Sequence, residues 1–184
     1  MSWKGSLLFF AVLAVAVLVF WQGGFWQELS GGISLKPGES REARVIRAID
    51  GDTLLVQSAN GTERVRMIGI DTPESIRPGV SVECGAKEAS AFMKRLADGK
   101  GIRLEDDPGG DTKDIYGRTL AYVYPQGSSR TFQEEILEAG WAEVYVFSSQ
   151  RFSKYGEFVQ SEETAEKSKR GVWRLCGGDF HSAS

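Results

Sequence analysis

Acidic and basic side chains gather in three short segments of the chain, where expected strands begin or end. The first segment is Ile-Asp-Gly-Asp-Thr at 49–53, the second runs from Arg66 to Glu74, and the third is Asp-Ile-Tyr-Gly-Arg at 114–118. Carboxylate oxygens suit a hard metal ion, and the planar guanidinium of arginine fits two oxygens of a phosphate. These residue types indicate chemistry based on carboxylates, arginines and a hard metal ion.

Histidine content and net charge argue against some kinds of active site and binding module. The only histidine, His181, lies close to the end of the chain, which argues against a Ser-His-Asp triad and against a two-histidine metal site. The formal net charge is −3, whereas a high-affinity nucleic-acid-binding module usually carries a basic face. A polyanionic ligand must therefore be held locally, by a few arginines or by a metal.

The N-terminal segment is strongly apolar. The apolar run from Leu7 to Trp21, counted through to Trp26, is long enough to cross a bilayer. The aromatic residues at its end suit a membrane–water interface. We therefore predict an N-terminal hydrophobic helix at 1–27 that acts as a membrane anchor, with a cleaved signal peptide as the alternative, and a linker at 28–42. In either case the remainder is expected to be extracytoplasmic, either membrane-anchored or secreted.

Cys84 and Cys176 are the only two cysteines of the chain. They are too few and too far apart in sequence to indicate a zinc site. In an oxidising compartment they can form a disulfide, which we expect, with two reduced thiols as the alternative.

The remaining chain alternates between strand-like and helix-like patterns. The predicted strands are 43–48, 53–57, 62–70, 102–105 and 119–124, and the predicted helices are 85–97, a second from a cap at Thr131 to about Gly140, and a third at about 155–169. This order fits an α+β fold with a mainly β core, namely a five-stranded OB-type barrel with three helices packed outside it. Asn-Gly at 60–61 predicts a hairpin, and Gly51 and Gly69 fit tight corners. The predicted domain covers 43–176, followed by a tail at 177–184.

The charged segments follow one another in a specific order. They read Ala-Ile-Asp-Gly-Asp-Thr at 48–53, Arg-x-x-x-x-Asp-Thr-Pro-Glu at 66–74 and Asp-x-Tyr-Gly-Arg at 114–118. With these motifs, the chain resembles the thermonuclease (staphylococcal nuclease) family over about residues 43–173. One motif alone would be weak, but three in order with every charged position filled are specific.

The resemblance implies a metal site. Asp52 and Asp71 match carboxylates that bind Ca²⁺, and Thr72 matches a residue that lends its backbone carbonyl. This set agrees with the oxygen ligands that Ca²⁺ prefers.

The resemblance also implies a reaction. Glu74 matches the residue thought to act as general base on a water molecule, and Arg66 and Arg118 match the pair that clamps the scissile phosphate. Because arginine is hard to deprotonate, we expect Arg118 to act electrostatically. Tyr116 and Tyr145 match substrate-flanking positions. The implied protein is a monomeric, Ca²⁺-dependent endo- and exonuclease that cuts the P–O5′ bond of DNA and RNA and leaves 3′-phosphates.

Some positions depart from the family pattern. Ile115 stands where a lysine often helps to bind a terminal phosphate, and Phe147 stands in the place of a second substrate-flanking tyrosine. The loop after Glu74 is often rich in lysine, whereas here Arg77 is its only basic residue. These changes predict weaker substrate binding and leave the catalytic set intact.

Simpler interpretations exist for each residue taken singly. Asp-Gly-Asp at 50–52 is common in turns, Arg66 and Arg118 can be surface charges, and Asp114 is expected to order its loop rather than touch substrate. The alternative functions are a non-catalytic OB-type module that binds nucleic acid or a protein, and a structural cell-surface module. Degenerate relatives typically lose the arginines or the carboxylates, which this chain keeps, so we predict the enzyme.

Overall fold

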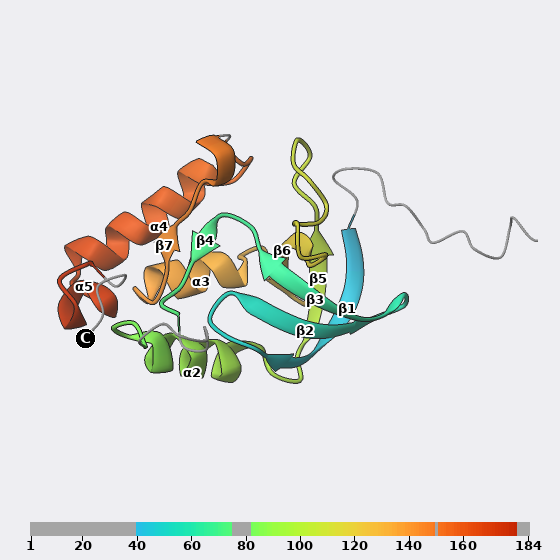
Figure 1. Cartoon of the computed structure of the whole chain (residues 1–184), viewed down its shortest axis with the longest axis horizontal. Coiled ribbons are helices and arrows are strands. Elements are labelled where there is room, and N and C mark those ends of the chain that lie inside the picture. The colour runs from blue at the N-terminus through green and yellow to red at the C-terminus, as the bar shows by residue number, and fades with distance from the viewer. Residues whose placement is uncertain (1–39, 75–81, 150, 180–184) are drawn as a thin grey trace, which may run out of the picture. The chain divides into compact units, whose positions relative to one another are not determined.

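The computed structural model of the chain describes residues 40–74, 82–149 and 151–179 (Figure 1). The predicted anchor at 1–27 lies outside these residues, as do most of the predicted linker and residues 180–184. Among the described residues, no helix is long and apolar enough to span a membrane.

Five strands close into a barrel, as the sequence predicts. The strands are β1 (Ser40–Ala48), β2 (Thr53–Ser58), β3 (Gly61–Met67), β5 (Gly101–Glu105) and β6 (Thr119–Pro125). Their order around the barrel is β1-β2-β3-β6-β5, with β5 paired back onto β1. All neighbouring strands are antiparallel except β3 and β6, which are parallel. Inward side chains such as Leu54, Val56 and Val65 are fully buried and alternate with outward ones.

Helices pack outside this barrel, in agreement with the predicted α+β architecture. They are α2 (Ala86–Ala97), α3 (Phe132–Glu138) and α4 (Tyr155–Lys167), followed by one further turn, α5 (Val172–Leu175). The cap predicted at Thr131 is a capping box, in which its hydroxyl accepts the N–H of Glu134 and its own N–H donates to the Glu134 carboxylate. Helix α3 contacts both β6 and α4, and α2 contacts β1.

The hairpin and both glycine corners occur as predicted, but the strand predicted at 62–70 is too long. Strand β3 ends at Met67, and the chain turns at Gly69, whose φ is 80°. The ring of Phe152 approaches Gly69 so closely that a Cβ there would collide with it. The chain then continues as β4 (Ile70–Asp71), which pairs with β7 (Glu143–Val144) in a separate two-stranded sheet. This turn directs the segment after β4 across the end of the barrel.

The barrel also begins earlier than the predicted domain start at residue 43. Ser40–Glu42, placed in the predicted linker, pair with residues 103–105 of β5. The guanidinium of Arg41 donates to the buried carboxylate of Asp106 at 3.0 Å. These contacts make the first residues of β1 part of the barrel.

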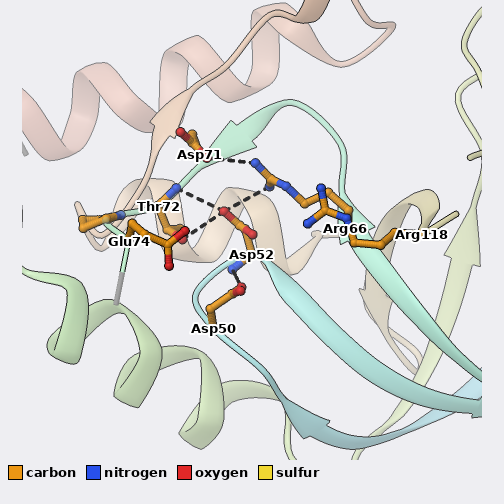
Figure 2. A pocket seen from close by; sticks show the side chains of 8 residues that line it. Asp50, Asp52, Arg66, Asp71, Thr72, Glu74 and Arg118 are labelled. Carbon is orange, nitrogen blue, oxygen red and sulfur yellow. Dashed lines mark hydrogen bonds and ion pairs between the residues drawn. The ribbon is translucent and has the colours of Figure 1, made fainter. Parts of the chain in front are cut away.

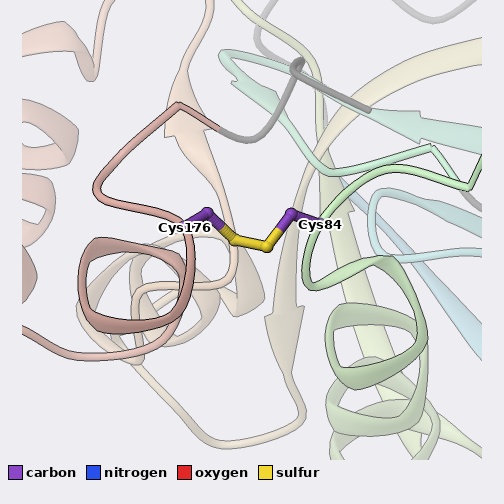
Figure 3. Close-up of a disulfide and its surroundings, with 2 residues drawn as sticks. All are labelled: Cys84 and Cys176. Atoms are coloured by element: carbon purple, nitrogen blue, oxygen red, sulfur yellow. A yellow bond between two sulfur atoms is a disulfide. The ribbon is translucent and has the colours of Figure 1, made fainter. Parts of the chain in front are cut away.

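The two cysteines are joined in a disulfide (Figure 3). Cys84 stands just before α2 and Cys176 just after α5, with their Cα atoms 6.1 Å apart. The bond spans 92 residues of sequence. It therefore ties the segment just before α2 to the C-terminal end of the domain.

Candidate active site

The predicted catalytic and metal-binding residues meet at one end of the barrel (Figure 2). They line a pocket of about 130 Å³. Its lining comes from the β1–β2 turn, β3, the segment from Asp71 to Glu74 and the residue just before β6. The lining residues are Asp50, Asp52, Arg66, Asp71, Thr72, Pro73, Glu74 and Arg118.

The β1–β2 turn presents Asp52 to this pocket. The Asp50 carboxylate accepts the backbone N–H groups of Asp52 and Thr53 at 3.0 and 2.7 Å, which fixes the turn. One oxygen of Asp52 accepts the hydroxyl of Thr53. The other accepts both the N–H and the hydroxyl of Thr72, at 3.2 and 3.0 Å. Asp52 thereby joins the turn to the segment after β4.

A close approach explains the glycine between the two aspartates. An added Cβ at Gly51 would lie 2.7 to 2.8 Å from three side-chain atoms of Thr72. Any larger residue at position 51 would therefore push Thr72 away from Asp52. The glycine is required by packing against the pocket rather than by backbone conformation.

Arg66 bridges the two predicted metal-binding carboxylates. Its Nη1 lies 3.1 Å from Asp52 Oδ2, and its Nη2 lies 2.8 Å from Asp71 Oδ1. Nη1 also donates to the carbonyl of Ile70 at 2.9 Å. Both carboxylates therefore converge on one guanidinium, at a point where β3 and β4 meet.

Asp50 is a pocket residue that the predicted site did not include. Burial, and then the charge of Asp52, raises the pKa of the Asp50 carboxyl to about 7, although N–H groups of the turn donate to it. Asp50 therefore binds a proton more readily than an ordinary aspartate. The signal in the sequence was the Asp-Gly-Asp spacing, which places two carboxylates in one tight turn.

Arg118 is held by an acid of its own loop. The Nε of Arg118 donates to Asp114 Oδ2 at 2.6 Å, and Asp114 Oδ1 accepts the N–H groups of Tyr116 and Arg118, both at 2.9 Å. Burial alone would raise the pKa of Asp114, but the hydrogen bonds and charge of Arg118 outweigh it and lower this pKa. Asp114 orders its loop, as expected, and it also orients Arg118.

The backbone of Glu74 is hydrogen-bonded to Glu83, nine residues later in the sequence. Its N–H donates to the carboxylate of Glu83 at 2.7 Å, and its carbonyl accepts the N–H of Glu83 at 3.1 Å. Glu83 precedes Cys84, one end of the disulfide. No motif in the sequence pointed to this pairing.

The two tyrosines predicted to flank the substrate do not line the pocket. Tyr116 is 78% exposed and Tyr145 is 44% exposed. The guanidinium of Arg118 lies 5.5 Å from the centre of the Tyr116 ring. Their role in substrate binding stays a prediction.

The chemistry of the lining fits a hard cation. Its four carboxylates outnumber its two guanidiniums, and all the predicted donors are oxygens. Within the described ranges, no three or more His, Cys, Asp or Glu side chains form a group that could hold a metal ion. The predicted set has two carboxylates and a backbone carbonyl, so it needs water or substrate oxygens to complete it.

Comparisons with known proteins show to which family the chain is similar. The model of the family described as "Staphylococcal nuclease homologue" matches residues 64–175, which include all of the lining from Arg66 to Arg118. A thermonuclease of Staphylococcus hyicus is 40% identical over 131 residues, covering 71% of this chain and 74% of that protein. A thermonuclease of Staphylococcus intermedius is 33% identical over 168 residues, covering 88% and 94%. The SPbeta prophage-derived endonuclease YokF of Bacillus subtilis is 40% identical over 133 residues, covering 71% and 43%.

Fold, pocket and sequence similarity lead to the same assignment. The closed five-stranded barrel carries the charged residues at one end, and the family match extends over more than half of the chain. The chain therefore belongs to the family of staphylococcal nuclease homologues.

Proposed function

We propose that this nuclease hydrolyses phosphodiester bonds in DNA and RNA, depends on Ca²⁺ and leaves 3′-phosphate products. The observation that carries the proposal is the convergence of Asp52, Asp71, Glu74, Arg66 and Arg118 on one small pocket. A binding module has no need for a carboxylate beside two phosphate-binding guanidiniums. Two relatives named thermonuclease, which match most of the chain, support the same activity.

The metal would be held by Asp52, Asp71 and the backbone carbonyl of Thr72. Bound Ca²⁺ would supply positive charge that polarises a phosphate oxygen and offsets the excess of carboxylates in the pocket. In the protein alone, Arg66 contacts both of these carboxylates. Its guanidinium therefore stands beside the proposed metal site.

The hydrolysis step uses Glu74 and the two arginines. Glu74 takes a proton from a water molecule whose oxygen forms the new bond to phosphorus. The P–O5′ bond breaks, and the 5′ oxygen takes a proton from solvent. Arg66 and Arg118 stay cationic throughout and stabilise the negative charge that builds on the phosphate oxygens.

A nuclease assay on the full-length chain tests this function. Single-stranded DNA and RNA are incubated with the wild type, Glu74→Gln and Arg118→Ala, in Ca²⁺ or in EDTA, and the ends are analysed for 3′-phosphate. We expect Ca²⁺-dependent shortening that both variants lose by at least two orders of magnitude, as for loss of a base or of transition-state donors. Arg174→Ala, an exposed arginine on α5, is the matched control and keeps full activity. Binding without any shortening across Ca²⁺ concentrations and pH would favour the OB-type binding module instead.

We also propose that the protein acts outside the cytoplasm. The apolar N-terminal run and the disulfide between Cys84 and Cys176 support this location, because disulfides persist in oxidising compartments. Fractionation of cells that express the full chain tests it. Nuclease activity confined to the cytoplasm, with both thiols reduced, would contradict it.

A further inference from the structure

Two arginines lie side by side on the outer face of the barrel. Arg47 on β1 is in register with Leu55 on β2, and Leu55 is in register with Arg64 on β3. Strands β1, β2 and β3 are neighbours in the barrel (Figure 1). Residues in register on adjacent strands share a face, so the Cα atoms of the two arginines stand about 10 Å apart across Leu55. Both arginine side chains are exposed.

A bulge in β1 places the first of these arginines on that face. The pairing of β1 with β2 shifts register between Val45 and Arg47, which leaves Ile46 as an extra residue. Val45 and Ala48 are both buried, so strict alternation along β1 could not make both of them point inward. The extra residue turns Arg47 outward, which is a recognised effect of β-bulges near functional sites.

No acidic side chain shares this face on β2 or β3. The only acidic residue of the two strands is Glu63, which by alternation belongs to the opposite face from Arg64. Its carboxylate accepts the hydroxyls of Ser58 and Thr119. Within the described ranges, the side chains of Arg47 and Arg64 take part in none of the ion pairs. A local excess of positive charge therefore exists on a chain whose net charge is −3.

The two arginines lie close to the pocket. Arg64 and Arg66 are two residues apart on β3, so they point to the same side of the strand, with Cα atoms about 7 Å apart. Arg66 lines the pocket. The outer face of the second and third strands is also the surface on which OB-type barrels commonly bind oligonucleotides.

We propose that Arg47 and Arg64 form a second phosphate-binding site, which holds the backbone of a polynucleotide next to the bond being cut. The proposal rests on nucleic acid being the ligand of the proposed function, and not on the metal or on the role of any pocket residue. The ligand class is a single-stranded nucleic acid of several nucleotides, bound through its phosphates without sequence preference. A substrate too short to leave the pocket makes no contact with this site.

The salt dependence of DNA binding distinguishes a phosphate-binding role of Arg47 and Arg64 from a purely structural one. The full-length wild type, Arg47→Gln, Arg64→Gln and the double variant are assayed on a long single-stranded DNA and on a trinucleotide over a range of salt. Each lost phosphate contact lowers the slope of log affinity against log salt by about 0.7, so the double variant loses about 1.4. We expect its KM for the long DNA to rise roughly tenfold near physiological salt, with kcat unchanged. The trinucleotide kinetics stay those of the wild type.

Two controls complete the test. Arg64→Lys keeps the positive charge, so we expect it to keep most of the wild-type slope of log affinity against log salt. Arg174→Gln removes one positive charge from α5, and we expect it to leave the slope and the KM unchanged. The proposal is overturned if the double variant keeps the wild-type slope and KM on long DNA, or if its KM rises equally on the trinucleotide. If the wild type binds long DNA with the expected slope but cleaves nothing, the proposed catalytic function fails while this binding site stands.

Discussion

The contact between Asp114 and Arg118 allows a quantitative prediction for Asp114→Asn. Asparagine keeps one oxygen that can accept the N–H groups of Tyr116 and Arg118, so the loop retains its backbone contacts. The other oxygen becomes an NH₂ group that faces the Nε–H of Arg118, and the 2.6 Å ion pair is lost. The substitution therefore releases the Arg118 side chain without removing the loop's internal hydrogen bonds.

The magnitude follows from the type of contact. Hydrogen bonds to charged groups contribute about 1.5–3 kcal/mol, and the lower end applies here because the side chains are 27% and 16% exposed. About 1.5 kcal/mol corresponds to roughly a tenfold lower kcat. The pKa of Asp114 is lowered in the folded chain, so the ion pair persists above the ordinary aspartate pKa of 3.8 and is lost only in stronger acid. The fold-change should consequently stay constant from mildly acidic to alkaline pH.

A double-mutant cycle identifies the route of the effect. Steady-state kinetics on single-stranded DNA are measured for Asp114→Asn, Arg118→Ala and the combination, with thermal unfolding of each variant as the control for folding. If Asp114 acts by orienting Arg118, its substitution changes nothing further once Arg118 is absent. An equal loss of kcat in both backgrounds, or no loss in the single variant, would refute the reasoning.

Three further substitutions test contacts elsewhere. Gly51→Ala displaces Thr72, which a Cβ would meet at 2.7 to 2.8 Å, so we expect kcat/KM to fall roughly tenfold to a hundredfold while circular dichroism still reports a folded barrel. Replacing Cys84 and Cys176 by serine removes a cross-link over 92 residues and lowers the free energy of unfolding in urea by about 4.5 kcal/mol in the chain-entropy model. Burial, with neighbouring glutamates, raises the pKa of Glu162, so the folded chain loses stability as pH rises through that pKa. Glu162→Gln therefore stabilises by about 0.5 kcal/mol at neutral pH, and the gain disappears well below pH 4.5.

Each of these has an outcome that contradicts it. Full activity of Gly51→Ala would mean that Thr72 can shift without harm to the pocket. Equal unfolding midpoints of the disulfide-bonded and serine-substituted chains would remove the stabilising role of the cross-link. A stability gain from Glu162→Gln that is the same at pH 4 and at pH 8 would show that its charge is not the cause.

The barrel is predictable from sequence because local patterns specify most of it. Val65 and Met67 alternate with polar residues in β3 and mark its inward face, and the Asn-Gly pair marks the hairpin between β2 and β3. The spacing from Thr131 to Glu134 marks the start of α3. Each of these signals lies within a few residues of the feature that it specifies.

The errors occur where a distant contact decides the structure. Ser40–Glu42 have the composition of a linker, and only pairing with residues 103–105 makes them strand. The apolar pattern of β3 continues to Ile70, but the ring of Phe152 and the positive φ of Gly69 impose a turn. Strands β4 and β7 have two residues each, too short for any periodic signal.

Part of the candidate site was predicted from the sequence, and part of it depends on contacts that the sequence does not show. The resemblance to the staphylococcal nuclease family named six of the eight residues that line the pocket, and it missed Asp50 and Pro73. Tyr116 and Tyr145 were placed by motif position alone, and both lie outside the lining. The contacts that hold the proposed catalytic residues could not be predicted, because a hydrogen-bond partner leaves no pattern in a single sequence.

The proposed catalytic residues of this domain differ in how they are held in place. Arg66 belongs to β3, and Asp52 stands in the turn just before β2, where its carboxylate accepts hydrogen bonds from Thr72. Glu74 and Arg118 lie at the ends of loops, where Glu83 accepts the backbone N–H of Glu74 and Asp114 accepts the Nε–H of Arg118. Neither Glu83 nor Asp114 belongs to the barrel core. We therefore expect substitutions of these two acids to lower kcat with little change in the free energy of unfolding. The disulfide begins at the residue after Glu83, and it thus ties the partner of Glu74 to the end of α5, outside the barrel strands.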